Sequence, residues 1–278
     1  MDGMTDGTHR RAAGAEPPVL VARAGRIATL TLNRPRVRNA LNAELIRAMR
    51  RELAVLDRDP DIDAIVLTGA DPAFCAGLDL RELGDSGRNV GTGNAEGIPA
   101  GRAWAPLSTP VIGAVNGPAV AGGLEIALNC DFLIASERAV FADTHARVGV
   151  MPGWGVSVLL PERVGFATAR RMSLTGDFVG AAEALRTGLV TEVVAHGALA
   201  ATALRVAGAM SGDHRGGVAA MLASSRRIEA AALGKGPRIE AEGLAAWKRT
   251  FDRGAVVRSR DGVLARGRAQ REDRRISE

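Results

Sequence analysis

The stretch Pro110–Asp131 constrains the fold more than any other part of this sequence. It opens with a β-branched run, Val111–Val115, which is typical of a buried strand. Asn116-Gly117-Pro118 ends that strand, because glycine and proline interrupt regular structure. A glycine pair, Gly122-Gly123, then precedes a segment of helical composition that carries Glu125 in its first turn. The sequence therefore predicts a strand that ends in a glycine turn and leads at once into a helix.

Such a turn gathers unpaired backbone N–H groups at one point. The first N–H groups of a helix have no partner within it. Glycine adds no Cβ, so an anion or a developing oxyanion can approach these donors. Glu125 lies within one turn of them, where it can act as a general base. The alternative is a tight structural turn with a solvated glutamate favoured by the helix dipole. The stretch alone does not decide between the two.

The segments before this stretch alternate between strand and helix. Val19–Arg23 and Ile27–Leu32 predict a hairpin. Helical spacing of apolar residues within Ala43–Leu56 predicts a helix, and Ile62–Thr68 predicts the next strand. Strand, helix and strand in this order indicate a right-handed βαβ unit with a parallel sheet.

A second turn from strand to helix follows that parallel strand. Asp79 with Glu82 predicts a helix N-cap with its capping-box partner. Ala76-Gly77, just before it, would deliver backbone N–H groups near the start of that helix. Neighbouring parallel strands end at one edge of the sheet, where α/β folds bind ligands. We therefore expect the turns at Ala76 and Gly122 to lie together.

The remaining elements suggest an α/β core followed by helices. We expect a surface loop at Asp85–Gly97, helices at Arg102–Leu107, Ala167–Leu174 and Ala181–Arg186, strands at Asp131–Ala135, Val140–Ala142 and Leu189–Val194, and helices after Leu199 with breaks at Gly212, Gly216-Gly217 and 234–237. A chain of 278 residues can bury one large core. We divide it into a disordered leader, residues 1–16, a core, residues 17–195, and a helical C-terminal region, residues 196–278.

Composition excludes several classes of function. Tyrosine is absent and aromatic residues make up 3%, which disfavours stacking on nucleic-acid bases. The net charge of +5 comes mostly from the arginine-rich end after residue 252. The two cysteines, Cys75 and Cys130, lack the spacing of a zinc site, so we expect no metal. No apolar run approaches the roughly 18 residues of a membrane span. We expect a cytoplasmic protein with neither membrane nor nucleic acid as a partner.

Several motifs occur in the order of one known family. They are Leu32-Asn33-Arg34-Pro35 with Asn39-Ala40-Leu41, the run Phe74–Leu80, Ala114–Gly117 with Gly122-Gly123 and Glu125, Cys130-Asp131, Pro152-Gly153, and Gly188–Val190. From about residue 20 to residue 195 the chain resembles the crotonase, or enoyl-CoA hydratase/isomerase, superfamily. The resemblance implies an α/β fold, a crotonase-like spiral of ββα units with a helical C-terminal trimerisation region. It also implies a homotrimer or a dimer of trimers.

The resemblance further implies an acyl-CoA or enoyl-CoA thioester as substrate. Coenzyme A is then part of the substrate, and no other cofactor is expected. The family's oxyanion hole maps onto the N–H groups of Ala76 and Gly122. Its segments that hold CoA resemble the regions containing the residues Arg34, Arg36, Arg38, Ala40, Gly77, Leu78 and Asp79.

One departure from the family is informative. Its hydratases hold a water between two glutamates, and Glu125 matches the first. The second position, seven residues before Pro152-Gly153, is occupied by His145. Histidine has an ordinary pKa near 6.5, so we expect His145 to exchange a proton near neutral pH. Trp154-Gly155-Val156 stands where a more glycine-rich run is usual.

Four functions are consistent with these residues to different degrees. The leading one is a lyase that adds water to a 2-enoyl-CoA, with Glu125 activating the water and His145 exchanging the proton on the α-carbon. An isomerase on the same fold needs only one proton shuttle. A catalytically silent acyl-CoA-binding protein would keep the oxyanion hole alone. A serine thioesterase is disfavoured, because no Gly-x-Ser-x-Gly elbow occurs.

Overall fold

A six-stranded sheet organises the molecule. The computed structural model describes residues 16–91, 97–250, 254, 262 and 265. Most of the predicted leader and most of the arginine-rich end therefore lie outside the described residues. The sheet has the order β1-β2-β3-β4-β6-β9, in which only β1 and β2 pair antiparallel. Its strands are β1 Val19–Ala24, β2 Ile27–Leu32, β3 Ala64–Gly69, β4 Val111–Val115, β6 Phe132–Ser136 and β9 Glu192–Val194.

A smaller sheet of three strands stands beside the first, in the order β5-β7-β8. Its strands are β5 Ala119–Val120, β7 Val140–Ala142 and β8 Val179–Gly180. The chain passes from β4 in the large sheet to β5 in the small one through the predicted turn at Asn116–Pro118. The predicted hairpin and the parallel βαβ unit of β2, α1 and β3 are confirmed.

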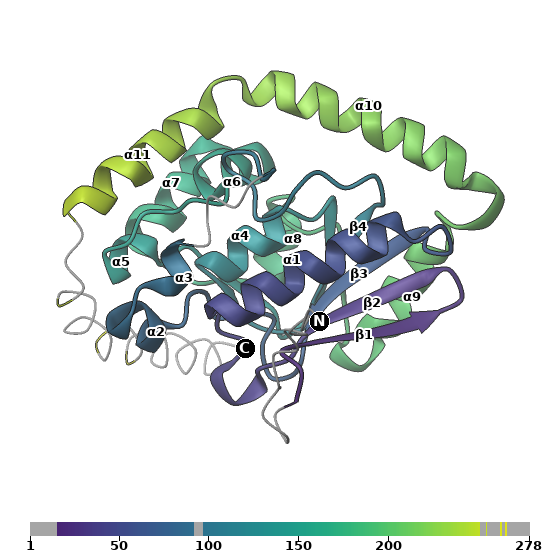
Figure 1. The fold of residues 1–278 in the computed structure, drawn as a ribbon, viewed down its shortest axis with the longest axis horizontal. Helices are drawn as coiled ribbons and strands as arrows, with labels where there is room; N and C mark the ends of the chain where they lie inside the picture. The colour runs from purple at the N-terminus through teal and green to yellow at the C-terminus, as the bar shows by residue number, and fades with distance from the viewer. Residues whose placement is uncertain (1–15, 92–96, 251–253, 255–261, 263–264, 266–278) are drawn as a thin grey trace, which may run out of the picture.

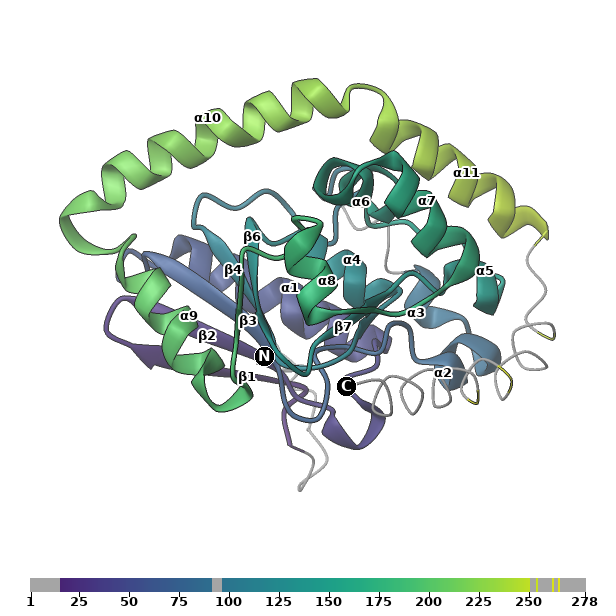
Figure 2. The same ribbon diagram turned by 180° about the vertical axis from the view of Figure 1, so that it is seen from behind.

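Helices cover both faces of the large sheet (Figures 1 and 2). The helices are α1 Ala43–Arg58, α2 Leu80–Asp85, α3 Arg88–Gly91, α4 Gly122–Leu128, α5 His145–Val148, α6 Val156–Val164, α7 Phe166–Thr175, α8 Ala181–Arg186, α9 Leu199–Gly208, α10 Arg215–Leu233 and α11 Gly236–Thr250, with short 3-10 turns η1 Pro35–Val37, η3 His196–Ala198 and η4 Gly212–His214. α1 is amphipathic, and its apolar face buries Leu45, Met49 and Leu53 in the main core. α9 closes the opposite face, with Leu199 and Ala203 packed against Ile112 and neighbouring residues.

The last two helices differ in their contacts with this body. α10 arches over the molecule, and none of its residues is buried (Figure 1). α11 descends beside α6 and buries one residue, Glu240. The boundary we drew after residue 195 stays a prediction, although α9 packs directly on the sheet.

Several local predictions were wrong. Arg102–Leu107 forms a bend and coil rather than a helix. Within the loop predicted at Asp85–Gly97, Arg88–Gly91 forms α3, and residues 92–96 lie outside the described residues. Gly216-Gly217 does not break a helix but lies inside the first turns of α10. These errors share a cause, because local propensity is a weak guide where tertiary contacts override it.

Candidate active site

The glycine turn of the opening stretch forms as predicted. β4 ends at Val115, and α4 begins at Gly122 and carries Glu125 in its first turn. Ala121, directly before the helix, has φ +48°, which is uncommon for a residue with a Cβ. Its N–H donates to the carbonyl of Ala142 on β7, so a hydrogen bond holds this unusual backbone in place.

A second amide lies beside this turn, and it belongs to Leu78. Leu41 and Leu78 form a parallel bridge, in which the Leu41 N–H donates to Gly77 O and the Asp79 N–H donates to Leu41 O. In such a bridge the central residue's own N–H points the other way. Gly122 lies on that side, since a Cβ built on it would be 3.8 Å from the Leu78 nitrogen. Within the described residues, neither the Leu78 nor the Gly122 N–H donates to the backbone. Together they can hold one oxyanion.

The prediction that Ala76 supplies this donor does not fit the structure. The Ala76 N–H donates to Arg38 O at 3.0 Å and is therefore already paired. The cause is Gly77, whose φ of +87° breaks the regular alternation of an extended chain, so that the amides of Ala76 and Leu78 point to opposite sides. Gly77 is also required by space, because a Cβ there would lie 2.8 Å from Val120 O.

Glu125 is buried and its two carboxylate oxygens have different surroundings. Oε1 accepts hydrogen bonds from the backbone N–H groups of Gly153 at 3.1 Å and Trp154 at 2.7 Å, with a longer contact from Val156 at 3.5 Å. These amides lead into α6. Oε2 faces His145 instead. One oxygen therefore fixes the carboxylate in position, and the other remains for chemistry.

His145 completes a row of three buried side chains. It opens α5, and its Nδ1 lies 2.6 Å from Asp143 Oδ1. Its Nε2 lies 3.5 Å from Glu125 Oε2. That separation is at the long end of the range for a direct hydrogen bond, and it also leaves room for a water about 2.8 Å from both atoms to bridge them. The predicted pairing of His145 with Glu125 is thus present in the geometry. Asp143 was missed, although it precedes His145 by only two residues.

The electrostatics of this row favour a charged imidazole. Burial alone lowers the pKa of His145, but the hydrogen bonds that its ring donates to Asp143 and Glu125, with the attraction of their charges, raise it to about 10. Burial raises the pKa of Asp143, but the hydrogen bonds from His145 and Ser173 and the attraction of the His145 charge together outweigh burial, so the net shift is downward. His145 is therefore an imidazolium at neutral pH. The expectation that it titrates near its ordinary value does not hold in this structure.

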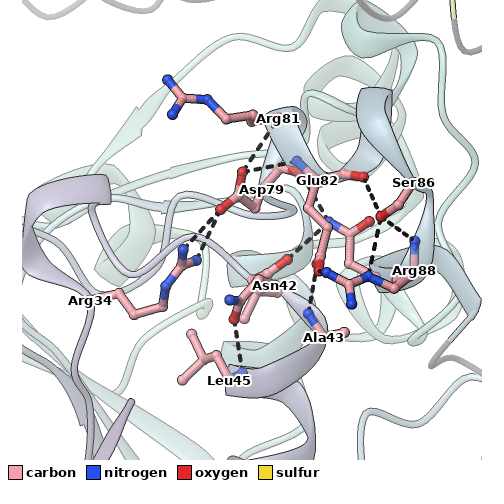
Figure 3. Close-up of polar contacts among 11 residues, drawn as sticks. Arg34, Asn42, Ala43, Leu45, Asp79, Arg81, Glu82, Ser86 and Arg88 are labelled. Atoms are coloured by element: carbon pink, nitrogen blue, oxygen red, sulfur yellow. Dashed lines mark hydrogen bonds and ion pairs between the residues drawn. The ribbon is translucent and has the colours of Figure 1, made fainter. Parts of the chain in front are cut away.

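The segments expected to hold CoA are joined by an ion pair (Figure 3). Arg34 pairs with Asp79 at 3.0 Å and also donates to Ala40 O. Arg36 and Arg38, which lie nearby in the sequence, are exposed. Asp79 is the N-cap of α2, as predicted, and accepts from the Arg81 and Glu82 amides.

Glu82 has a different partner from the one predicted. A capping box would return its carboxylate to the Asp79 N–H, but that N–H donates to Leu41 O. Glu82 Oε2 instead accepts from the Ala43 N–H at 2.7 Å, at the start of α1 (Figure 3). It therefore links the N-termini of two helices.

Two further features are absent from the described residues. These residues contain no group of three or more side chains suited to holding a metal ion. None of the helices they form is long and apolar enough to cross a bilayer.

Comparison with known proteins identifies the family. A family model described as enoyl-CoA hydratase/isomerase matches residues 22–252. The chain belongs to this family. It is 52% identical to an enoyl-CoA hydratase of Mycobacterium smegmatis of known structure, with a TM-score of 0.77 over 85% of this chain and 100% of the other. It is also 51% identical to the enoyl-CoA hydratase of Mycobacterium tuberculosis H37Rv, with a TM-score of 0.76 over 84% of this chain and 98% of the other.

More distant members also match. Enoyl-CoA hydratase EchA19 of Mycobacterium tuberculosis is 38% identical over 77% of this chain and 82% of its own length. A monofunctional enoyl-CoA isomerase from M. smegmatis is 32% identical, with a TM-score of 0.65 over 80% and 99% of the two chains. The crotonase α/β fold with C-terminal helices, expected from the resemblance, is confirmed.

Proposed function

We propose that this protein is an enoyl-CoA hydratase in which a buried histidine takes the place of the second acidic group. The observation that carries the proposal is the row of Asp143, His145 and Glu125, which puts a proton donor beside a proton acceptor. Its membership of the enoyl-CoA hydratase/isomerase family supports the thioester substrate. The hydratases of known structure at 52% and 51% identity support the reaction.

The proposed reaction moves two protons and one hydroxyl. Glu125 Oε2 takes a proton from water as the water oxygen attacks the β-carbon. The π electrons of the double bond then move to the thioester oxygen, and the N–H groups of Leu78 and Gly122 stabilise that enolate. Each such donor contributes about 3 kcal/mol in comparable sites. The imidazolium of His145 next protonates the α-carbon. Glu125 returns its proton to His145, and one water has been added.

The CoA end of the substrate would lie along the segments around Arg34 and Asp79. The exposed guanidinium groups of Arg36 and Arg38 suit phosphate oxygens, because arginine pairs with them bidentately. Ala40, Gly77 and Leu78 would then flank the pantetheine. All atoms of this reaction come from water and substrate, so no further cofactor is required.

A trimeric assembly or a dimer of trimers remains part of the proposal. Large apolar side chains stand exposed on α7 and α10, among them Leu174 at 76%, Met221 at 69% and Ile228 at 68%. Burial of such side chains between copies would be favourable. Light scattering of the purified protein measures this directly, and a monomer at micromolar concentration would contradict it.

The second candidate is double-bond isomerisation, which the 32% identity to an enoyl-CoA isomerase supports more weakly. It needs one group that removes and returns a proton. The third candidate, a silent acyl-CoA binder, would catalyse neither reaction.

Crotonyl-CoA separates the three candidates. Hydration removes the absorbance of the conjugated enoyl thioester, whereas isomerisation of a 3-enoyl-CoA creates it. We expect loss of absorbance with crotonyl-CoA and formation of the 3-hydroxyacyl product. Absence of that product, with turnover of the 3-enoyl-CoA, would replace the proposal with an isomerase. Binding without either reaction would identify a silent protein.

A further inference from the structure

α11 lies directly along the segment that supports the proposed catalytic groups. Its Trp247 Nε1 donates to Gly149 O at 3.1 Å, just after the helix that carries His145. A Cβ built on Gly153 would stand 2.6 Å from Leu244 Cδ2. One built on Gly236 would stand 2.3 Å from Val158 Cγ1. α11 thus follows residues 149–158 over most of its length, as Figure 1 shows beside α6.

A single buried charge lies in this contact. Glu240 is 6% exposed, and both of its oxygens accept backbone hydrogen bonds. Oε2 accepts from the Gly155 N–H at 2.8 Å, and Oε1 accepts from the Ser157 N–H at 2.9 Å. A buried carboxylate is costly unless it is fully paired, so these bonds fix α11 and the start of α6 relative to each other.

The same row of amides also holds Glu125. The N–H groups of residues 153, 154 and 156 contact Glu125, and those of residues 155 and 157 bind Glu240. The two carboxylates therefore accept hydrogen bonds from one backbone segment. At the start of α6, successive N–H groups of this segment point in turn to Glu240, Glu125 and Glu240. A shift of this segment by a few tenths of an ångström would change the hydrogen bonds of both.

We propose that Glu240 is a positioning residue for Glu125. It fixes the amides of residues 153–156 in the arrangement that holds Glu125 Oε1, so that Oε2 faces the water and His145. This inference rests on the proposed function, in which Glu125 is the base. The C-terminal helix would then affect the chemical step without touching the substrate.

The electrostatics agree with this close packing. Burial raises the pKa of Glu240, and repulsion from Glu125 raises it further, whereas the bonds from the Ser157 and Gly155 amides lower it. Two like charges at one helix start are tolerated because the amides and the helix dipole stabilise both.

The test compares Glu240→Gln with Glu242→Gln. Glu242 is exposed on the same helix and, among the described residues, pairs with Arg238 alone, at 3.5 Å, so its substitution controls for loss of a charge from α11. Glutamine at 240 turns one acceptor into a donor that opposes a backbone N–H. We expect kcat with crotonyl-CoA to fall roughly 10- to 100-fold in Glu240→Gln, consistent with the loss of precise placement of the base. Affinity for butyryl-CoA should change little, and the melting temperature should fall by only a few degrees, as expected for one lost buried hydrogen bond. Glu242→Gln should resemble the wild type.

A double-mutant cycle with Glu125→Asp isolates the coupling. If Glu240 acts through Glu125, the two substitutions should be non-additive in kcat. An unchanged kcat in Glu240→Gln, additive effects, or a joint fall of kcat, affinity and melting temperature would each overturn the inference. If Glu240→Gln does not fold, Glu240→Asp carries the same test, because it keeps both oxygens and shortens their reach.

The outcome is distinguishable from failure of the proposed function. A wild-type protein that does not hydrate crotonyl-CoA refutes the hydratase. The positioning role is then measured through isomerisation of a 3-enoyl-CoA, in which the same carboxylate would be the base. A wild-type protein that catalyses neither reaction refutes both.

Discussion

The two halves of the candidate site are built in different ways. One half consists of backbone amides, those of Leu78 and Gly122, which a parallel bridge and a helix start hold in place. The other half consists of side chains, the row of Asp143, His145 and Glu125. The amides can bind any thioester oxygen, and their ability to do so depends little on which side chains the residues carry. The chemistry of the side-chain row depends entirely on which residues form it, because changing one of them changes the charge of its neighbours. The difference suggests that the backbone half selects the substrate class and the side-chain half selects the reaction.

The largest effect should come from the side-chain half. Glu125→Gln keeps an oxygen for the amides of Gly153 and Trp154 but removes the base. We expect kcat to fall roughly 100- to 10,000-fold, the usual contribution of a general acid or base. The Kd for butyryl-CoA, measured by calorimetry, should stay within about twofold, because the backbone half is intact. Near-normal turnover would remove Glu125 from the mechanism and break the comparison.

The backbone half should show a somewhat smaller effect. Gly122→Pro removes one N–H at the first helical position, where proline is tolerated. We expect a loss of kcat of about 100- to 1,000-fold. Gly122→Ala is the matched control, because it keeps the amide and its Cβ would be tight only against the Leu41 side chain, with Cδ1 at 3.1 Å. Gly77 Cα at 3.7 Å and the Leu78 nitrogen at 3.8 Å would be at ordinary contact distances. If both variants lose equal activity in the same crotonyl-CoA assay, the amide is not a catalytic donor.

A smaller, pH-dependent effect should follow from Asp143→Asn. If the imidazolium of His145 is the acid, activity falls as pH rises through its pKa of about 10. Removing the Asp143 charge lowers that pKa, so the fall should begin at lower pH. Above the new pKa, each further pH unit lowers activity about tenfold. Profiles of kcat against pH for the two proteins test this, and identical alkaline limbs would show that Asp143 does not tune His145.

The smallest effect should appear in stability. Since the folded-state pKa of His145 is raised from 6.5 to about 10, its charge stabilises the fold fully below pH 6.5. That contribution is lost as pH rises through about 10. His145→Gln should therefore flatten the decline of the unfolding free energy between these values, as measured by urea denaturation. An equal decline of the unfolding free energy in both proteins would show that a group other than His145 loses its proton over this pH range.

The sequence predicted the turns of this site better than their contacts. The glycine turn before Glu125 is local, so the β-branched run and the glycine pair were enough to locate it. The identity of the second amide, which lies beside the Gly122 turn, could not be predicted from local sequence. The inward position of Leu78, rather than Ala76, depends on the pairing with Leu41, which lies on a distant segment. The glycine at 77, which takes a positive φ in the structure, was a local signal of this reversal.

Side-chain partners across long sequence separations were equally hidden. The spacing of Asp79 and Glu82 predicted the N-cap of α2, but it could not show that Glu82 serves α1 instead. Glu240 lies among other charged residues of the C-terminal region, and nothing near it in sequence marks it as buried. Its partners, Gly155 and Ser157, precede it by more than 80 residues. Such pairs become visible only when the chain is folded.

The 3.5 Å between His145 Nε2 and Glu125 Oε2 bears on the stereochemistry of the product. Two groups so close together reach the same face of a planar double bond. If they act as proposed, the hydroxyl and the new hydrogen are delivered to that one face, and the addition is syn. Hydration of crotonyl-CoA in D2O would then give one diastereomer of 2-deuterated 3-hydroxybutyryl-CoA, which proton NMR coupling constants identify. A mixture of diastereomers would mean that the proton on the α-carbon comes from bulk solvent.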